Sequence, residues 1–276
     1  MQRLWRFLLD SLIIAVIFSV LGSPGRSVEP EQVSMETGLH SLQKNDYITS
    51  IEQLIFQKTN EERAARGAEP MPALQPDLEL SAIARQHSTD MLSLSFFSHE
   101  NPDGHSYSDR MLQNHRRAIL LATGENIWKQ SKSIPGKPDE VASEIVASWM
   151  RSIPHRRNIL SQRYTHLGVG VAMENDTILA TQDFAGVLAY LAKPLPETVR
   201  WGDRIDVSIS EKFRDLGPLE KFDFFDPDTA RVSGKSSRIV KGRVKVSPGR
   251  YLLRLYFRNT DANGWVIYKG PAIQVE

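Results

Sequence analysis

The chain has 276 residues, of which 41% are hydrophobic and 24% charged, a composition typical of a globular protein that buries a full core. Its 34 Lys and Arg residues nearly balance 33 Asp and Glu residues, and a net charge of +1 argues against nucleic acid or an anionic membrane as a partner. The chain contains no cysteine, which excludes disulfides, thiolate metal sites and a thiol nucleophile.

The first 22 residues have the pattern of a secretion signal. Arg3 and Arg6 precede an apolar run over residues 12–21, which has the length of a signal-peptide core and is short for a membrane span. We therefore expect residues 1–22 to direct the chain to a secreted, periplasmic or cell-envelope location, with an uncleaved N-terminal membrane anchor as the alternative. Residues 23–45 show no sustained period and are expected to form a linker.

Three segments have helical periodicity, because their apolar side chains recur at spacings of three and four. The stripes are Ile48, Ile51, Leu54 and Ile55; then Leu80, Ile83, Ala84, His87 and Met91; and, after Pro138, Val141, Ala142, Ile145, Val146, Trp149 and Met150. Two strand candidates over residues 167–173 and 177–184 flank the turn cluster Glu174-Asn175-Asp176 and predict an antiparallel hairpin. Helices mixed with a hairpin predict an α+β domain over residues 46–190.

The period changes to two in the C-terminal part of the chain. Alternating apolar residues occur at Ile205, Val207 and Ile209, at Val244 and Val246, and at Tyr251, Leu253, Leu255 and Phe257, with turns at Pro248-Gly249 and Asn263-Gly264. This pattern predicts a second domain over residues 197–276, a small all-β sandwich of immunoglobulin-like type. Its aromatic side chains Phe222, Phe224, Tyr251 and Trp265 are expected to pack in the core or on a sheet face, while an envelope protein or polysaccharide is the partner expected for the domain.

Five short blocks follow one another in a fixed order. They are Phe97-Ser98-His99, Gly124-Glu125-Asn126-Ile127, Trp149 with His155-Arg156-Arg157-Asn158-Ile159-Leu160, Gly168-Val169-Gly170-Val171, and Gln182-Asp183-Phe184. In this order the blocks resemble the bacterial branch of the CAP superfamily (cysteine-rich secretory protein, antigen 5, pathogenesis-related 1), also called SCP-like, from about Asp46 to Ala185. The resemblance implies an α-β-α sandwich and places His99, Glu125 and His155 around one cleft.

His99, Glu125 and His155 carry the functional hypotheses. Imidazole and carboxylate groups suit a divalent ion such as zinc, and three protein ligands would leave one coordination position open. The residues are 26 and 30 positions apart, which matches no local metal-binding pattern, so their convergence follows only from the resemblance. Three interpretations stay open: these residues anchor an apolar, glycan or peptide ligand, they hold the metal of a divalent-metal-dependent hydrolase, or the histidines fix the shape of the cleft through hydrogen bonds.

One family position departs from the pattern. Animal and plant members carry a second glutamate three residues after the tryptophan of the third helix, and here that place holds Ser152. The nearest carboxylate, Glu144, falls on the polar face of its helix beside Arg151, so we expect it to be solvated. The loss of this second acid weakens the case for a four-ligand metal site and for any chemistry that needs paired carboxylates.

The remaining polar candidates have structural interpretations. His87 is expected in the core at the floor of the cleft and His166 at the surface, while His40, His105 and His115 fall in linker or loop sequence. The basic residues Arg110, Arg116, Arg117, Arg156 and Arg157 fit either a solvated face or a site for an anionic ligand.

The sequence lacks a Gly-x-Ser-x-Gly elbow, a His-Glu-x-x-His helix and a phosphate loop. Ser98 could act as a nucleophile only with a histidine other than its neighbour His99. The sequence therefore predicts an exported binding or interaction module and leaves open whether the protein is an enzyme.

Overall fold

The computed structural model describes residues 30–66, 71–131, 136–237, 241–259 and 261–276. The predicted signal segment, residues 1–22, lies outside these ranges. The chain forms two compact units, Met1–Lys44 and Asn45–Glu276. Among the residues that the structure describes, no helix is both long and apolar enough to cross a membrane.

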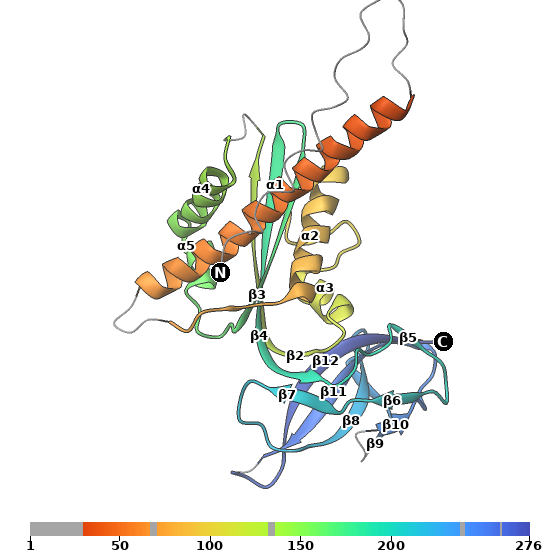
Figure 1. The fold of residues 1–276 in the computed structure, drawn as a ribbon. Coiled ribbons are helices and arrows are strands. Elements are labelled where there is room, and N and C mark those ends of the chain that lie inside the picture. The colour runs from red at the N-terminus through yellow and green to blue at the C-terminus, as the bar shows by residue number, and fades with distance from the viewer. Residues whose placement is uncertain (1–29, 67–70, 132–135, 238–240, 260) are drawn as a thin grey trace, which may run out of the picture. The chain divides into compact units, whose positions relative to one another are not determined.

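Helices and strands are mixed along the chain, as the sequence predicts (Figure 1). The helices are α1 (Pro30–Ala65), α2 (Leu78–Ser93), α3 (Tyr107–Asn114), α4 (Pro138–Arg151) and α5 (Ile153–Ile159). The longer strands are β2 (Ala118–Gln130), β3 (His166–Glu174), β4 (Thr177–Leu191), β8 (Leu219–Asp226), β9 (Arg231–Ser237), β11 (Gly249–Arg258) and β12 (Trp265–Val275). The short strands are β1 (Gln75–Pro76), β5 (Thr198–Val199), β6 (Arg204–Asp206), β7 (Ile209–Lys212) and β10 (Lys241–Arg243).

The central sheet has the strand order β1-β3-β4-β2, with β7 pairing with β4 as well. The predicted hairpin is confirmed, because β3 and β4 are antiparallel and close at the pair Glu174 and Thr177. Asn175 in its turn has a φ of 49°, a left-handed conformation that asparagine tolerates. The pattern did not predict β2, which pairs antiparallel with β4 along its length.

Helices cover both faces of this sheet (Figure 1). On one face, α4 and α5 pack with Ile51 and Ile55 of α1 against β3 and β4, and Trp149 is the largest fully buried side chain. On the other face, Leu80 of α2 and Met111 of α3 pack against β2 and β4. The predicted stripes of α2 and α4 are therefore buried as expected, and the stripe of α1 is buried at Ile51 and Ile55 and partly buried at Ile48 and Leu54. The arrangement has a helix layer, a sheet layer and a second helix layer.

The Gly168-Val169-Gly170 block brings α2 against β3. A Cβ atom on Gly170 would lie 2.0 Å from the backbone N of Arg85, and one on Gly168 would lie 2.2 Å from the carbonyl carbon of Leu80. Ser88 of the same helix donates a hydrogen bond to the Gly170 carbonyl at 3.0 Å. Glycine is needed at both positions because helix backbone occupies the space of a side chain.

Helix α1 begins earlier than the sequence predicts. It starts at Pro30, inside the segment expected to be a linker, rather than near Asp46. Proline suits the first turn of a helix, where its missing N–H has no partner to lose. The polar composition of residues 30–45 hid this helix, because no apolar stripe marks it.

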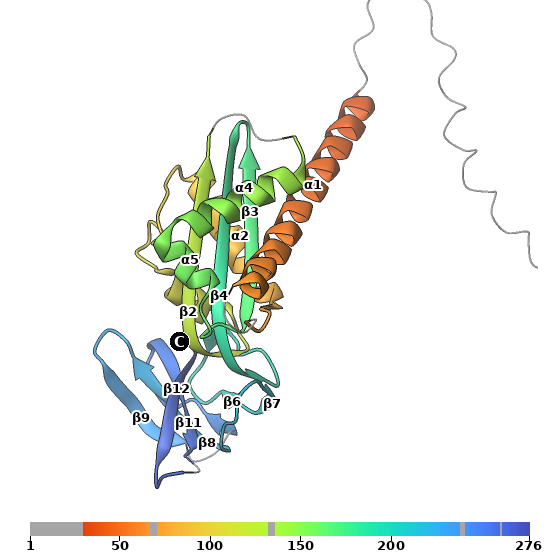
Figure 2. The ribbon, with the colours of Figure 1, turned by 90° about the vertical axis from the view of Figure 1, so that its left-hand side faces the viewer.

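The C-terminal strands form a five-stranded sheet of order β5-β12-β11-β8-β9 and a two-stranded sheet of β10 and β6. The alternating run over residues 251–257 and the Asn263-Gly264 turn correspond to β11, β12 and their connection, which lie side by side in Figure 2. Phe222, Phe224 and Tyr251 are buried as predicted. Trp265 is 46% exposed on the sheet face, with the Lys221 ammonium 3.8 Å from its ring centre.

These strands share a hydrophobic core with the end of the central sheet. Leu188, Ala189 and Leu191 of β4 belong to the same buried cluster as the apolar side chains of β8 and β11. Arg116 adds hydrogen bonds to the carbonyls of Leu195, at 2.9 Å, and Ala272, at 2.6 Å. Arg116 is therefore a structural link, which argues against the solvated-face alternative for this residue. The separation of a sandwich domain over residues 197–276 stays a prediction.

Candidate functional site

His99 and Glu125 meet although 26 residues separate them. His99 lies in the loop between α2 and α3, and Glu125 lies on β2, the edge strand of the central sheet. Nδ1 of His99 is 2.7 Å from Oε1 of Glu125. The Glu125 side chain is fully buried and the His99 ring is 49% exposed. The imidazole thus faces outward with a buried carboxylate behind it.

The second oxygen of Glu125 is occupied by cationic or polar neighbours. Arg110 of α3 donates a hydrogen bond from Nη2 to Oε2 of Glu125, and Nε2 of His87 lies 3.9 Å from the same oxygen. Arg110 is 6% exposed, so the solvated-face alternative is wrong for this residue. An arginine is tolerated in the interior here because the carboxylate and two backbone carbonyls accept hydrogen bonds from its Nη1 and Nη2 groups.

His87 is buried, as its position on the apolar stripe predicts. Its Nε2 lies 2.9 Å from the carbonyl oxygen of Ser98 and donates to it, since a carbonyl only accepts. Burial lowers the pKa of His87, although the charge of Glu125 opposes this effect. His87 therefore holds the loop that carries His99 while remaining neutral.

Asp183 is a further member of this cluster that the sequence did not single out as a site residue. It lies on β4 directly opposite Glu125 in the strand register and is fully buried. Burial, and then the negative charge of Glu125, raise the pKa of Asp183 well above its usual range. The Gln182-Asp183-Phe184 block was the available signal, because it contains the strand partner of Glu125.

The cluster contains buried polar atoms that other described residues leave unpaired. They are Nδ1 of His87 and Nε of Arg110. Asp183 also has a hydrogen bond to the Glu125 side chain, which contributes to its raised pKa. A buried polar atom without a partner costs about 1–3 kcal/mol. Groups held at a cost to stability are typical of functional sites.

His155 reaches this region from α5. It is half-buried, and its pKa is lowered first by burial and then by electrostatic repulsion from His99. Asn126, next to Glu125 on β2, donates from Nδ2 to the His155 carbonyl at 3.2 Å. The structure thus joins His99 to Glu125 directly, and Asn126 links the His155 backbone to the strand that carries Glu125.

Glu125 does not fit the role of a zinc ligand in this geometry. One of its oxygens is hydrogen-bonded to His99 and the other to Arg110, and its side chain is fully buried. Within the described ranges, no group of three or more His, Cys, Asp or Glu side chains is placed to hold a metal ion. The residues therefore resemble a histidine with a supporting carboxylate more than a three-ligand metal site.

Side chains from α4, α5 and the loop after α5 form hydrogen bonds with the outer edge of β2. Three side chains donate to alternate backbone carbonyls of this strand: Tyr164 to Thr123 at 3.1 Å, Asn158 to Glu125 at 3.0 Å and Trp149 to Ile127 at 3.1 Å. Alternate residues of a strand direct their carbonyls to the same edge, so these donors take the place of a neighbouring strand. Trp149 and Asn158 therefore have structural roles that hold Glu125 in place.

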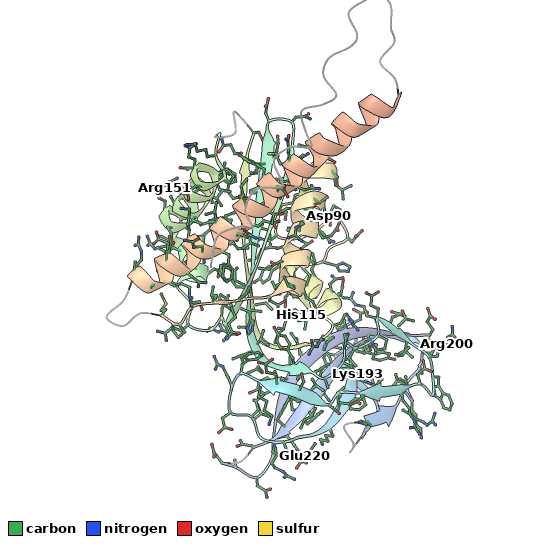
Figure 3. The ribbon with its side chains drawn as sticks, in the orientation of Figure 1. Asp90, His115, Arg151, Lys193, Arg200 and Glu220 are labelled. Carbon is green, nitrogen blue, oxygen red and sulfur yellow. The ribbon has the colours of Figure 1, made fainter. Side chains whose placement is uncertain are left out.

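The polar residues outside the cluster divide into confirmed and corrected predictions. Glu144 has a half-exposed side chain that pairs with Arg151 at 2.8 Å, which confirms its place on the solvated face. His166 is 2% exposed, so its expected surface position is wrong. His115 lies in the connection between α3 and β2, as the sequence predicts, and is buried there. His166 packs against the ring of Phe213, and His115 ends α3 (Figure 3).

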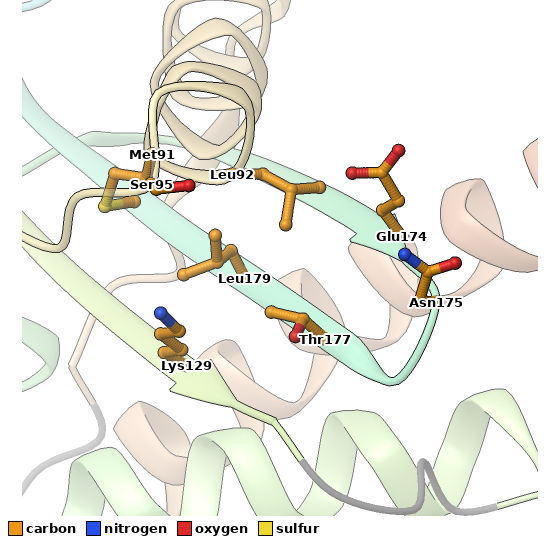
Figure 4. Close-up of a pocket in the computed structure, with 8 residues that line it drawn as sticks. All are labelled: Met91, Leu92, Ser95, Lys129, Glu174, Asn175, Thr177 and Leu179. Carbon is orange, nitrogen blue, oxygen red and sulfur yellow. The ribbon is translucent and has the colours of Figure 1, made fainter.

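A small pocket lies apart from the three predicted site residues (Figure 4). Its volume is about 230 Å³, and it is lined by Met91, Leu92, Ser95, Lys129, Glu174, Asn175, Thr177 and Leu179. It lies between the end of α2 and the turn of the β3–β4 hairpin. A pocket of this volume is smaller than those that enclose drug-sized ligands.

One family model matches the middle of the chain. Residues 56–184 match the sequence model of the CAP family, described as the cysteine-rich secretory protein family. This match agrees with the resemblance seen in the sequence and covers less than half of the chain.

Two curated relatives come from Bacillus subtilis (strain 168). The uncharacterized protein YkwD is 38% identical over 139 residues, which cover 50% of this chain and 48% of the relative. The uncharacterized membrane protein YlbC is 33% identical over 136 residues, which cover 49% of this chain and 34% of the relative. The chain thus spans less than half the length of either relative.

Solved structures also resemble the chain. An extracellular protein containing an SCP domain from Bacillus anthracis str. Ames is 27% identical with a TM-score of 0.42, and the match covers 58% of this chain and 45% of that one. A cysteine-rich secretory protein from Staphylococcus aureus subsp. aureus Mu50 is 20% identical with a TM-score of 0.36, covering 51% and 38%.

Proposed function

We propose that the CAP part of this chain is an extracytoplasmic ligand-binding module whose ligand contacts the imidazoles of His99 and His155. The observation that carries the proposal is the contact between the half-exposed ring of His99 and the buried carboxylate of Glu125. A buried carboxylate fixes the orientation of an imidazole and leaves its second nitrogen for an incoming group. Glu125 then supports the ligand site from behind.

The ligand classes are those expected from the sequence: an apolar molecule, a glycan or a peptide. A thermal-shift screen of short peptides, oligosaccharides and small apolar molecules tests this proposal. Compounds that bind the site stabilise the wild type and the Glu144→Gln variant but neither His99→Ala nor His155→Ala. Compounds that stabilise both histidine variants as well as the wild type would place the binding site elsewhere.

A divalent-metal-dependent hydrolase is the second candidate. The arrangement of Glu125 behind His99 favours it, because metal-ligating histidines commonly donate their other ring nitrogen to a carboxylate. Such a metal would have His99 and His155 as ligands, with Glu125 as the supporting group. Turnover that is lost on chelation and restored by zinc supports this candidate, and turnover that is insensitive to chelators contradicts it.

Export and the role of the C-terminal strands complete the proposal. The Arg3 and Arg6 pattern supports a signal over residues 1–22, and a mature N-terminus near Ser23 would be its product. The C-terminal strands, as an immunoglobulin-like sandwich, would contact an envelope protein or polysaccharide. A pull-down of wall polysaccharide by the full chain but not by a chain ending at Leu191 tests this role.

A further inference from the structure

Arg110 connects three separate pieces of the polar cluster. Its Nη1 donates to the carbonyl oxygens of His99, at 2.9 Å, and His105, at 3.1 Å, and its Nη2 donates to Oε2 of Glu125. The two carbonyls lie on the loop between α2 and α3, which carries the His99 ring, and Glu125 is on the strand behind that ring. The buried guanidinium of Arg110 therefore contacts both the backbone of this loop and the Glu125 carboxylate that faces the His99 ring.

The local structure fixes Arg110 itself. Helix α3 starts with a capping box, in which the Ser106 side chain accepts from the backbone N–H of Asp109 and the Asp109 side chain accepts from the backbone N–H of Ser106. This cap sets the first turn of the helix and hence the direction of Arg110 one residue later. The loop is also closed by Asn101, whose side chain accepts from the His105 backbone N–H at 2.8 Å. Arg110 thus donates from a capped helix to a hydrogen-bonded turn.

The arrangement determines which nitrogen of His99 is available. Arginine only donates, so Oε2 of Glu125 accepts from it, and a carboxylate has no hydrogen to donate to His99 from its other oxygen. Nδ1 of His99, 2.7 Å from the other oxygen, must then carry a hydrogen. The neutral ring consequently has its lone pair on Nε2.

We propose that Arg110 is a positioning residue that sets His99 in the Nδ1–H tautomer and presents the Nε2 lone pair to the ligand. The inference rests on the proposed function, and it narrows the ligand. The group that meets Nε2 is a hydrogen-bond donor, such as a hydroxyl or an amide N–H, or a metal ion. Lysine cannot replace Arg110, because one ammonium group cannot span two carbonyls and a carboxylate in the planar geometry of a guanidinium.

Nuclear magnetic resonance of the full chain with ¹⁵N-labelled histidine tests the proposal without any ligand. Long-range ¹H–¹⁵N correlations at pH 8 report the tautomer of each ring, and the His99→Gln variant assigns the His99 signals. We expect the Nδ1–H tautomer in the wild type and in the Arg163→Gln control, which alters an exposed arginine. In Arg110→Lys we expect the Nε2–H tautomer to become populated. A wild type in the Nε2–H tautomer, or a folded Arg110→Lys variant with unchanged signals, would overturn the proposal.

A second measurement applies if Arg110→Lys does not fold. The guanidinium N–H groups of Arg110 in the wild type should exchange slowly with water and show Overhauser contacts to the loop over residues 99–105, because the loop carbonyls and Glu125 hold them. Fast exchange without these contacts contradicts the positioning role. Neither measurement involves a ligand. A ligand screen without a hit would therefore count against the proposed function only, and the tautomer of His99 tests the role of Arg110 independently.

Discussion

The pair formed by His115 and Asp77 makes the stability of the protein depend on pH in a defined window. Nε2 of His115 lies 2.9 Å from Oδ2 of Asp77, and its Nδ1 lies 3.0 Å from Oε2 of Glu79. Burial opposes the charge of His115, but the hydrogen bonds to both carboxylates outweigh it and raise the pKa of His115 to about 9. The pKa of Asp77 is lowered despite burial, because His115 and Tyr190 donate to its carboxylate.

The magnitude follows from the difference between the folded and unfolded pKa values of His115. A rise from 6.5 to about 9 corresponds to roughly 3 kcal/mol, since each pKa unit is worth about 1.4 kcal/mol. A raised pKa stabilises the fold fully below pH 6.5, and the contribution is lost as the pH rises through 9. We expect His115→Gln to lack this contribution, so the free energy of unfolding of the wild type should fall relative to the variant by about 3 kcal/mol across this window.

Urea denaturation at pH 6, 7.5, 9 and 10 measures this effect. The difference in unfolding free energy between wild type and His115→Gln cancels the groups that titrate in both proteins. The control is His105→Gln, which removes an imidazole from the loop before α3 and leaves Asp77 and Glu79 in place. A wild-type advantage over His115→Gln that is the same at every pH would refute the reasoning.

Three further predictions test the fold and its processing. Gly170→Ala should destabilise the protein by about 1–3 kcal/mol in urea denaturation, because its new methyl group would meet the backbone of α2. Gly136→Ala, which has open space around its Cβ position, should be neutral. Equal effects of the two substitutions would contradict the packing argument. Limited proteolysis should cut within residues 192–203 if the C-terminal strands form a separate domain, and resistance of this segment would instead indicate one cooperative unit. Mass spectrometry of the native protein should find an N-terminus near residue 23, and an intact Met1 in the cytosol would contradict export.

The helices and strands that could be predicted were those whose apolar residues recur with a clear helical or alternating period. The β3–β4 hairpin followed from alternation on both sides of a turn cluster, and α2 and α4 followed from apolar stripes. Strand β2 was missed because its centre contains Gly124, Glu125 and Asn126, polar or small residues that tertiary contacts bury. The early start of α1 was missed because the polar residues of its first turns show no apolar stripe.

The site was predictable as a set of residues but not as an arrangement. The ordered blocks identified His99 and Glu125, whose contact the structure bears out. They did not identify Arg110, because a lone arginine in a helix looks like a solvated charge until a buried carboxylate is known to face it. Asp183 was quoted in a block without a role, since only the strand register shows that it lies opposite Glu125. Sequence spacing carries no information on such pairs when they come from distant elements.

Calorimetric titration with zinc tests most directly whether His99 and His155 face one site. Zinc is used as a probe of two neighbouring imidazoles, and the wild type should show one site near neutral pH that weakens below about pH 6 as the rings protonate. His99→Ala and His155→Ala should abolish binding, Glu125→Gln should weaken it by about 10–100-fold as expected for a supporting group, and Glu144→Gln should leave it unchanged. Equal zinc binding in the wild type and both histidine variants would contradict the account, because it would show that the two imidazoles do not act together.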